Sequence, residues 1–181
     1  MQTTLHASSS ARILYYTVRR SPLGQMLVAA TEQGVAAVLL GDSKTELIED
    51  LQRRYPQAWL QTGDTRLHRW SDTVLDMLER PTHSHALPLD VWQATDFQRK
   101  VWGALRAIPA GQTRSYSELA SAIGQPQAVR AVASACAANP LAVVVPCHRV
   151  LRRDGGWGGY RWGLERKQQL LRQEGAIRLL D

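Results

Sequence analysis

The chain has 181 residues, a formal net charge of +6, 44% hydrophobic residues and 21% charged residues. This is enough for one large or two small domains with a packed core. No apolar run approaches the roughly 20 residues that span a bilayer, and two cysteines, Cys136 and Cys147, are too few for a disulfide framework.

The positive charge lies in the second half of the chain. Residues 1–92 hold nine Lys and Arg against ten Asp and Glu, whereas residues 93–181 hold thirteen against six. A basic half suggests a polyanion partner, most simply nucleic acid. Many basic proteins bind no nucleic acid, so the charge by itself leaves both interpretations open.

The N-terminal half has the pattern of a small α+β unit. Residues 12–18, 26–31 and 34–40 predict strands of an antiparallel meander. Asp42 and Ser43 can cap a helix that runs to about Tyr55, and a second helix is expected over 64–80. We find no constellation in this half that carries chemistry.

Residues 81–90 (PTHSHALPLD) are the best candidate for a linker between domains, because they hold two prolines and few large apolar groups. His83 and His85 could suggest a metal site. With no cysteine nearby and no second pair of ligands, a solvated linker is the better interpretation.

Two capped helices are expected after the linker. Thr95 or Asp96 can begin a helix that ends before Pro109, and Ser115 with Glu118 fits a capping box at the start of a shorter one.

A further helix is expected from Pro126, at a first-turn position, to about Ala138. The two helices around Gly124 outline a helix-turn-helix. The second consists of small or β-branched residues with Arg130 as its only charge, which suits either close approach to a duplex or a tightly packed core helix. Cys136 is expected to be a small buried hydrophobic residue.

The run Val143–Val145 predicts a strand that Pro146 ends, so that Cys147 and His148 follow directly. A thiolate is a strong nucleophile, and a neighbouring imidazole is one way to favour it. A buried structural cysteine beside an unrelated histidine is the alternative.

The glycine-rich segment 152–160 lacks the Gly-Lys-Ser/Thr ending of a phosphate-binding loop, so we do not expect a nucleotide site there. A last helix is expected over 163–174.

Taken together, these motifs resemble the O6-alkylguanine-DNA alkyltransferases, also called methylated-DNA–protein-cysteine methyltransferases. The resemblance is dense over residues 93–175 and looser over 12–92. It rests on Phe97-Gln98, Val101-Trp102, Ile108-Pro109, Ser115-Tyr116, Leu119-Ala120, Arg130-Ala131-Val132, Asn139-Pro140, Pro146-Cys147-His148-Arg149-Val150, Gly159-Tyr160 and Leu170-Leu171.

The resemblance implies irreversible, single-turnover repair of DNA. Cys147 would accept a methyl or small alkyl group from O6 of guanine, or from O4 of thymine. His148 would take the thiol proton through a water, Glu174 would orient His148, and Tyr116 would help to turn the nucleotide and donate toward the base.

It also implies that double-stranded DNA with an alkylated guanine is bound in the minor groove by a monomer. Arg130 would fill the vacated stack, and Asn139 would tie the recognition helix to the active-site strand. The DNA-binding residues expected on this basis are Arg130, Ala128, Ala131, Ser115 and Asn139.

The alkyl pocket would be lined by Pro146, Val150, Tyr160 and Trp162. Trp162 stands where the better-known animal members carry a small residue, so bulky alkyl groups should be crowded. No cofactor is expected, nor any metal, because the N-terminal cysteines that would bind zinc are missing.

The implied fold is α+β. A ribonuclease-H-like α/β domain would cover residues 12–88, and a mostly helical, winged-helix-like domain with the helix-turn-helix would cover 92–176. The polar residues 1–12 lack the apolar stretch of a signal peptide, which favours the bacterial cytoplasm.

Two other functional classes fit part of the pattern. A non-catalytic alkyltransferase-like protein flips damaged bases, but it typically carries another residue in place of the cysteine. A piece of a transcription regulator would need a promoter-reading domain, which a basic second half does not supply.

Overall fold

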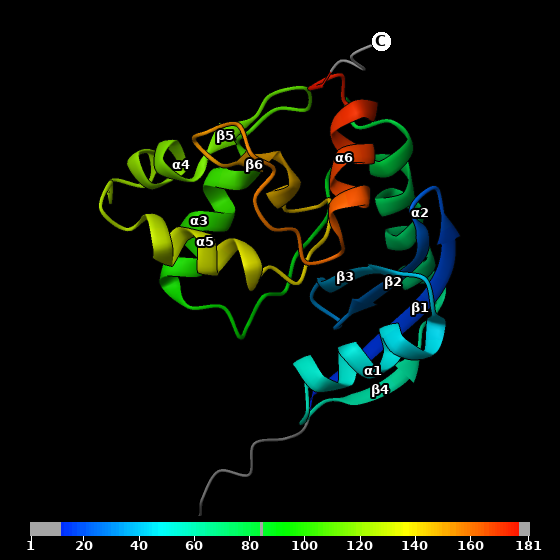
Figure 1. Ribbon diagram of the computed structural model, residues 1–181. Helices are drawn as coiled ribbons and strands as arrows, with labels where there is room; N and C mark the ends of the chain where they lie inside the picture. The colour runs from blue at the N-terminus through cyan, green and yellow to red at the C-terminus, as the bar shows by residue number, and fades with distance from the viewer. Residues whose placement is uncertain (1–11, 84, 178–181) are drawn as a thin grey trace, which may run out of the picture.

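A computed structural model describes residues 12–83 and 85–177, which form a sheet-containing N-terminal half and a mostly helical C-terminal half (Figure 1). The predicted α+β class is confirmed. The four-stranded sheet has the order β3-β2-β1-β4. Its strands are β1 (Ile13–Ser21), β2 (Gly24–Ala30), β3 (Val35–Gly41) and β4 (Trp59–Thr62).

The first three strands form the predicted antiparallel meander, but the fourth was not predicted. β4 pairs in parallel with β1, from Ile13 opposite Trp59 to Tyr16 opposite Thr62. It has four residues, and 68% of the Trp59 side chain is exposed. Such a short segment shows little periodicity of its own, and it forms because the edge of β1 offers hydrogen-bond partners.

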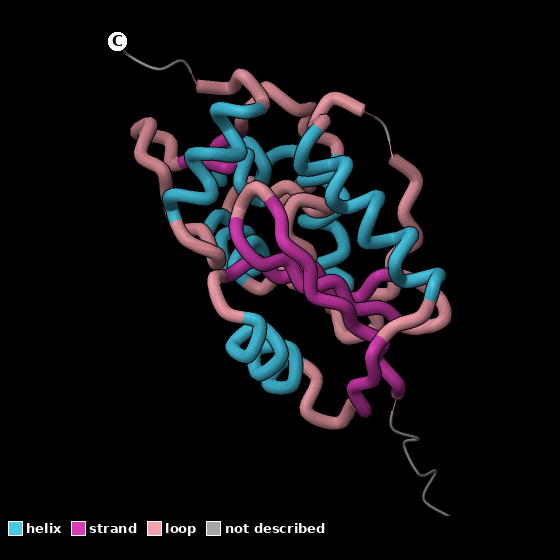
Figure 2. The backbone as a smooth tube through the Cα atoms, turned by 90° about the vertical axis from the view of Figure 1, so that its right-hand side faces the viewer, coloured by secondary structure: helices cyan, strands magenta, loops and turns pink. Residues whose placement is uncertain are grey.

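Two amphipathic helices lie on opposite sides of this sheet (Figure 2). α1 (Lys44–Arg54) is capped by Ser43, as predicted, and α2 (Thr65–Glu79), which was predicted over 64–80, is capped by Asp64. Their inward residues are the apolar ones that the spacing indicated, with Leu47 and Leu51 of α1 buried against the sheet.

The connection between the halves is only partly a solvated linker, so this prediction was wrong for its second part. Leu87 and Asp90 are buried. The backbone N–H of Val35 donates to Pro88 O at 2.8 Å, and the N–H of Asp90 donates to Val35 O at 2.9 Å. Strand β3 would otherwise be an open edge, and residues 88–90 supply hydrogen-bond partners for Val35 at its start, while residues 140–142 supply those for Val38.

His83 and His85 both lie near Asp76, with nitrogen–oxygen distances of 3.8 and 3.1 Å. Within residues 12–83 and 85–177, no three His, Cys, Asp or Glu side chains are grouped so that they could hold a metal ion.

Within residues 85–177 the structure has four α-helices, one 3-10 helix and a small two-stranded parallel sheet. They are α3 (Asp96–Arg106), β5 (Arg114–Ser115), α4 (Tyr116–Ala122), α5 (Val129–Ala137), η1 (Cys147–Arg149), β6 (Val150–Leu151) and α6 (Leu164–Gln173). The capping box of Ser115 and Glu118 is confirmed, and Thr95 with Gln98 forms a second one.

Helix α5 begins at Val129, three residues after the predicted start at Pro126. The segment before it is a turn in which the N–H of Ala128 donates to Gln125 O at 2.9 Å. Val132, Ala135 and Cys136 are buried where α5 packs against α3 and α4, and the indole of Trp102 in α3 donates to Ala135 O at 2.8 Å. The small residues therefore serve the core on this face, while the other face remains exposed.

The predicted strand over Val143–Val145 is wrong. Only Leu141 pairs with the sheet, as an isolated bridge to Val38, and the chain then coils until η1 begins at Cys147. Val143 has φ = +69°, which is rare for a β-branched residue. The N–H of Val145 returns to Leu141 O at 3.0 Å, so the segment closes on itself instead of extending.

Across the residues that the structure describes, no helix has both the length and the apolar character to cross a membrane.

Candidate active site

Cys147 lies at the start of η1, below the surface, with 7% of its area exposed. Its backbone N–H donates to Val145 O at 2.8 Å, which fixes the residue at the end of the coiled segment. Burial raises the pKa of the Cys147 thiol, while the Asn139 amide and the charge of Lys167 act in the opposite direction. The resting group is therefore a thiol, and a base is needed to make it a nucleophile.

The amide of Asn139 holds the cysteine in place. Its Nδ2 donates to Val145 O at 2.9 Å and contacts the Cys147 Sγ at 3.3 Å. Its Oδ1 accepts from the N–H of Leu141 at 2.9 Å. The residue is completely buried beside Cys147.

His148 and Glu174 form a buried pair next to the cysteine. The His148 Nε2 lies 2.8 Å from Glu174 Oε1, and neither side chain is more than 2% exposed. Glu174 is the C-cap residue of α6, so the last turn of that helix delivers the carboxylate. The His148 Nδ1 is buried without a hydrogen-bond partner among the described residues.

The protonation states follow from these contacts. Burial lowers the pKa of His148 more than Glu174 raises it, so the imidazole is neutral. Burial alone would raise the pKa of Glu174, but the hydrogen bonds from His148 and Arg149 outweigh this and lower it to about 2. A neutral imidazole that donates Nε2–H to this carboxylate keeps a lone pair on Nδ1.

Two charged residues of the site were not singled out from the sequence. Arg149 donates to both oxygens of Glu174. The ammonium of Lys167 donates to the backbone oxygens of Val150 at 2.6 Å, Trp157 at 2.5 Å and Gly159 at 3.3 Å. The signal for Lys167 was present, because the helical spacing from Lys167 to Leu170, Leu171 and Glu174 puts charged groups on the apolar face of α6.

Burial lowers the pKa of Lys167 to about 8, and the nearby Cys147 and Cys136 act in the opposite direction. Through its three hydrogen bonds, Lys167 of α6 links β6 to the glycine-rich segment. Burial also raises the pKa of Cys136 to about 12, which fits the small buried residue that we expected.

Aromatic rings stand beside the pair. The Tyr160 ring lies edge-on to His148 at 6.3 Å and to Trp162 at 5.3 Å between ring centres. Trp162 is 6% exposed. Pro146 and Val150, which flank η1, are buried as well. Pro146 and Val150 are thus close to the cysteine in the chain, Tyr160 contacts the histidine, and Trp162 contacts Tyr160.

Tyr116 begins α4 on the other side of the glycine-rich segment. A Cβ at Gly158 would come within 3.0 Å of its hydroxyl, and Gly158 has φ = +65°, so this position suits only glycine. Burial raises the pKa of Tyr116, which keeps the hydroxyl protonated and able to donate at neutral pH.

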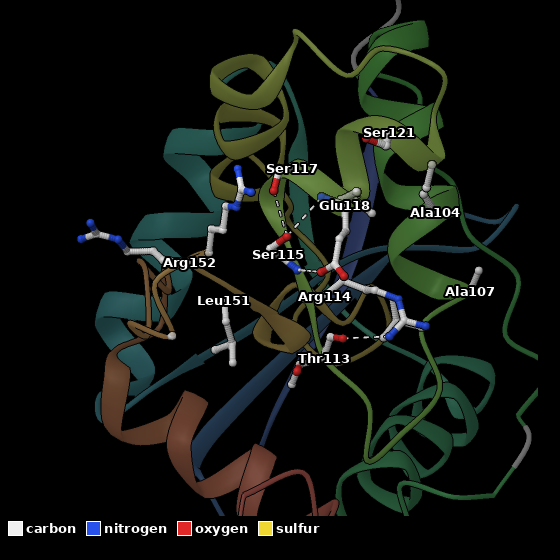
Figure 3. Close-up of a pocket in the computed structure, with 15 residues that line it drawn as sticks. Ala104, Ala107, Thr113, Arg114, Ser115, Ser117, Glu118, Ser121, Leu151 and Arg152 are labelled. Carbon is white, nitrogen blue, oxygen red and sulfur yellow. Dashed lines mark hydrogen bonds between the residues drawn. The ribbon is translucent and has the colours of Figure 1, made fainter.

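Of the residues expected to bind DNA, Arg130 and Ala131 are exposed on α5 and Ala128 caps its start. Ser115 lies at the start of α4, where it joins Ser117 and Glu118 in a hydrogen-bonded cluster (Figure 3). Arg114 and Arg152 stand on opposite sides of this cluster.

The cluster lines a hollow of about 990 Å³ between α3, α4 and the segment after β6. Cys147 is not part of its lining, so this hollow is separate from the cysteine.

Two family models match the chain. The model described as "6-O-methylguanine DNA methyltransferase, DNA binding domain" matches residues 96–176. The model described as "6-O-methylguanine DNA methyltransferase, ribonuclease-like domain" matches residues 14–80.

Similar proteins include the "Bifunctional transcriptional activator/DNA repair enzyme Ada" of Escherichia coli, 50% identical over 88% of this chain and 45% of that protein. The chain therefore spans less than half of that relative. The inducible methylated-DNA–protein-cysteine methyltransferase of Bacillus subtilis is 37% identical over 87% of this chain and 88% of its own length. A crystal structure of Mycobacterium tuberculosis OGT in complex with DNA superposes with a TM-score of 0.73, at 33% identity over 90% and 93% of the two chains.

The buried carboxylate predicts an acid-sensitive fold. Because the pKa of Glu174 is lowered from its ordinary 4.5 to about 2 in the folded protein, its contribution to stability is present above pH 4.5 and is lost as the pH falls toward 2. The free energy of unfolding of Glu174→Gln, measured in urea from pH 6 to pH 2, should lie below that of the unchanged protein by on the order of 3 kcal/mol at pH 6. The gap should narrow across that window.

Glu165→Gln is the matched control, because Glu165 is exposed in the first turn of the same helix. If the difference in the free energy of unfolding between Glu174→Gln and the unchanged protein stayed constant from pH 6 to pH 2, Glu174 would not be an ionised carboxylate with a lowered pKa.

Proposed function

Because the chain belongs to the 6-O-methylguanine DNA methyltransferase family, we propose that it repairs DNA by transferring a methyl group from O6 of guanine to Cys147. The observation that carries the proposal is the buried cysteine next to a neutral histidine whose other nitrogen is bound to an ionised carboxylate. Small alkyl groups, and O4 of thymine, fall within the same proposal.

The first step is the activation of the thiol. Its proton passes through a water to Nδ1 of His148, which is the only imidazole nitrogen not engaged with Glu174. The hydrogen bond from Asn139 then stabilises the sulfur as it gains charge. His148 acts as the base, Glu174 orients it, and Cys147 is the nucleophile.

The second step is displacement at the methyl carbon. A carbon–sulfur bond forms, the bond between carbon and O6 breaks, and its electron pair goes to the guanine. The protonated hydroxyl of Tyr116 donates toward the base as it leaves. The thioether has no route back to a thiol, so each molecule performs one transfer.

The partner is double-stranded DNA. The target atom lies inside the duplex, so the nucleotide must be turned out of the stack before it can reach a buried cysteine. We infer that α5 enters the minor groove, that its exposed Arg130 fills the vacated stack, and that Ala128 and Ala131 permit close approach. Ser115 would contact the backbone beside it. The proposed form is a monomer of the bacterial cytoplasm.

The decisive measurement is the intact mass of the protein after it is mixed with a duplex that contains one O6-methylguanine. We expect a gain of one methyl group per molecule, and peptide mapping should place it on Cys147. Cys147→Ser should gain nothing, whereas Cys136→Ser should still gain one, because Cys136 is a buried packing residue. Binding of the duplex without any change in mass would refute the transfer.

Arg130 should matter for duplex DNA alone. Because unstacking a base costs a few kcal/mol, Arg130→Ala should slow transfer from duplex by roughly tenfold or more and leave the reaction with the free base O6-methylguanine unchanged. The matched control is Arg20→Ala, which removes the same charge from an exposed site on β1. Equal losses on both substrates would argue against a role in turning out the nucleotide.

Trp162 should restrict the size of the alkyl group. The unchanged protein is expected to react poorly with O6-benzylguanine, and Trp162→Leu should react at least about tenfold faster, because the smaller side chain opens the wall next to Tyr160. Transfer of methyl should change much less. Trp59→Leu, at an exposed tryptophan of β4, controls for the substitution itself. Rapid labelling of the unchanged protein would show that Trp162 does not crowd the pocket.

A further inference from the structure

Arg149 makes more hydrogen bonds to the active-site carboxylate than His148 does. Its Nε donates to Glu174 Oε2 at 3.0 Å and its Nη2 to Oε1 at 2.8 Å, a two-pronged arrangement. Its Nη1 donates to the backbone oxygen of Ile108, beyond the end of α3, at 2.5 Å. The guanidinium is thereby fixed from two elements, and the Arg149 side chain is 11% exposed.

The surroundings of His148 contain few other charges. The titratable groups that face it in the described part of the chain are Glu174, Arg149, Lys167, Cys147 and Tyr160. The ammonium of Lys167 donates its hydrogen bonds to three backbone oxygens. Arg149 is thus the cation that directly contacts the carboxylate to which His148 is bound.

We propose that Arg149 is a positioning residue for the methyl transfer: it holds the Glu174 carboxylate against Nε2 of His148 and balances its charge, so that His148 enters the reaction as a neutral base. The proposal rests on the proposed function, because it assigns a role within the same site. Arg149 acts through Glu174 and His148, not on the reacting atoms.

The physical reason is the balance of charge in a buried cluster. A carboxylate whose only partner is an imidazole favours the imidazolium form, since opposite charges at this distance stabilise each other. An imidazolium has no lone pair and cannot accept the thiol proton. With Arg149 in place, the negative charge already has a cationic partner, and the imidazole can remain neutral while its orientation is kept.

The test is the titration of His148 by NMR of its imidazole, from pH 5 to pH 8.5, in the unchanged protein and in Arg149→Met. We expect the pKa of His148 to move upward in the variant. The rate of methyl transfer from duplex should then fall more steeply between pH 8 and pH 6 than in the unchanged protein. An additional tenfold loss of rate corresponds to an upward shift of the His148 pKa by about one unit, because the fraction of neutral imidazole then falls tenfold.

Three further variants make the result specific. Arg106→Met removes the same charge from an exposed site in the last turn of α3 and should leave the titration unchanged. Arg149→Lys keeps the charge without the two-pronged geometry and should fall between the unchanged protein and Arg149→Met. In Arg149→Met combined with Glu174→Gln the upward shift should disappear, because the carboxylate that would attract a proton to His148 is gone.

A purely structural role would give a different result. Slower transfer at every pH, with an unchanged titration of His148 in both Arg149→Met and Arg149→Lys, would overturn the proposal. The titration needs no methylated substrate, so it tests Arg149 even if the unchanged protein transfers no methyl group, a result that would refute the proposed function instead.

Discussion

The site depends on one buried amide. Asn139 donates to the backbone oxygens of Leu141 and Val145 and accepts from the N–H of Leu141, so a single side chain replaces the ladder partners that a strand would have supplied. The segment coils for this reason, and the coil brings the Cys147 sulfur within 3.3 Å of the same amide. The left-handed backbone at Val143 costs on the order of 1–3 kcal/mol, and the surrounding hydrogen bonds maintain it.

The charges around the cysteine are arranged so that none is left unpartnered by the described residues. Glu174 accepts from His148 and Arg149, and the Lys167 ammonium donates to three carbonyl groups. A buried charge without such partners would be expelled or neutralised. Since burial keeps the thiol protonated and the imidazole neutral, reactivity requires a proton transfer between them and is not a standing property of the sulfur.

The sequence was informative wherever the cause of a structure is local. Helix caps such as Ser43 and the box of Ser115 with Glu118 lie within four residues of their partners, and Cys147-His148 are adjacent. Strand β4 could not be predicted, because its partner β1 lies more than 40 residues away. The valine run misled us because its β-branched residues favour strands, whereas the bonds of Asn139 override that preference. The contact between Arg149 and Glu174 joins positions 25 residues apart, which no local pattern reveals.

The N-terminal half constrains the candidate site through α6. Side chains of this helix donate to the other half: Arg166 to Leu23 O at 2.8 Å and to the Asp42 carboxylate at 2.6 Å, and Gln169 to Pro22 O at 3.2 Å. The same helix carries Lys167 and has Glu174 as its C-cap residue. Because a helix is stiff over ten residues, contacts at its first turns determine where its last residue stands. The position of the Glu174 carboxylate is therefore set jointly by both halves of the chain, and the cysteine segment is tied to the same sheet through the bridge from Leu141 to Val38.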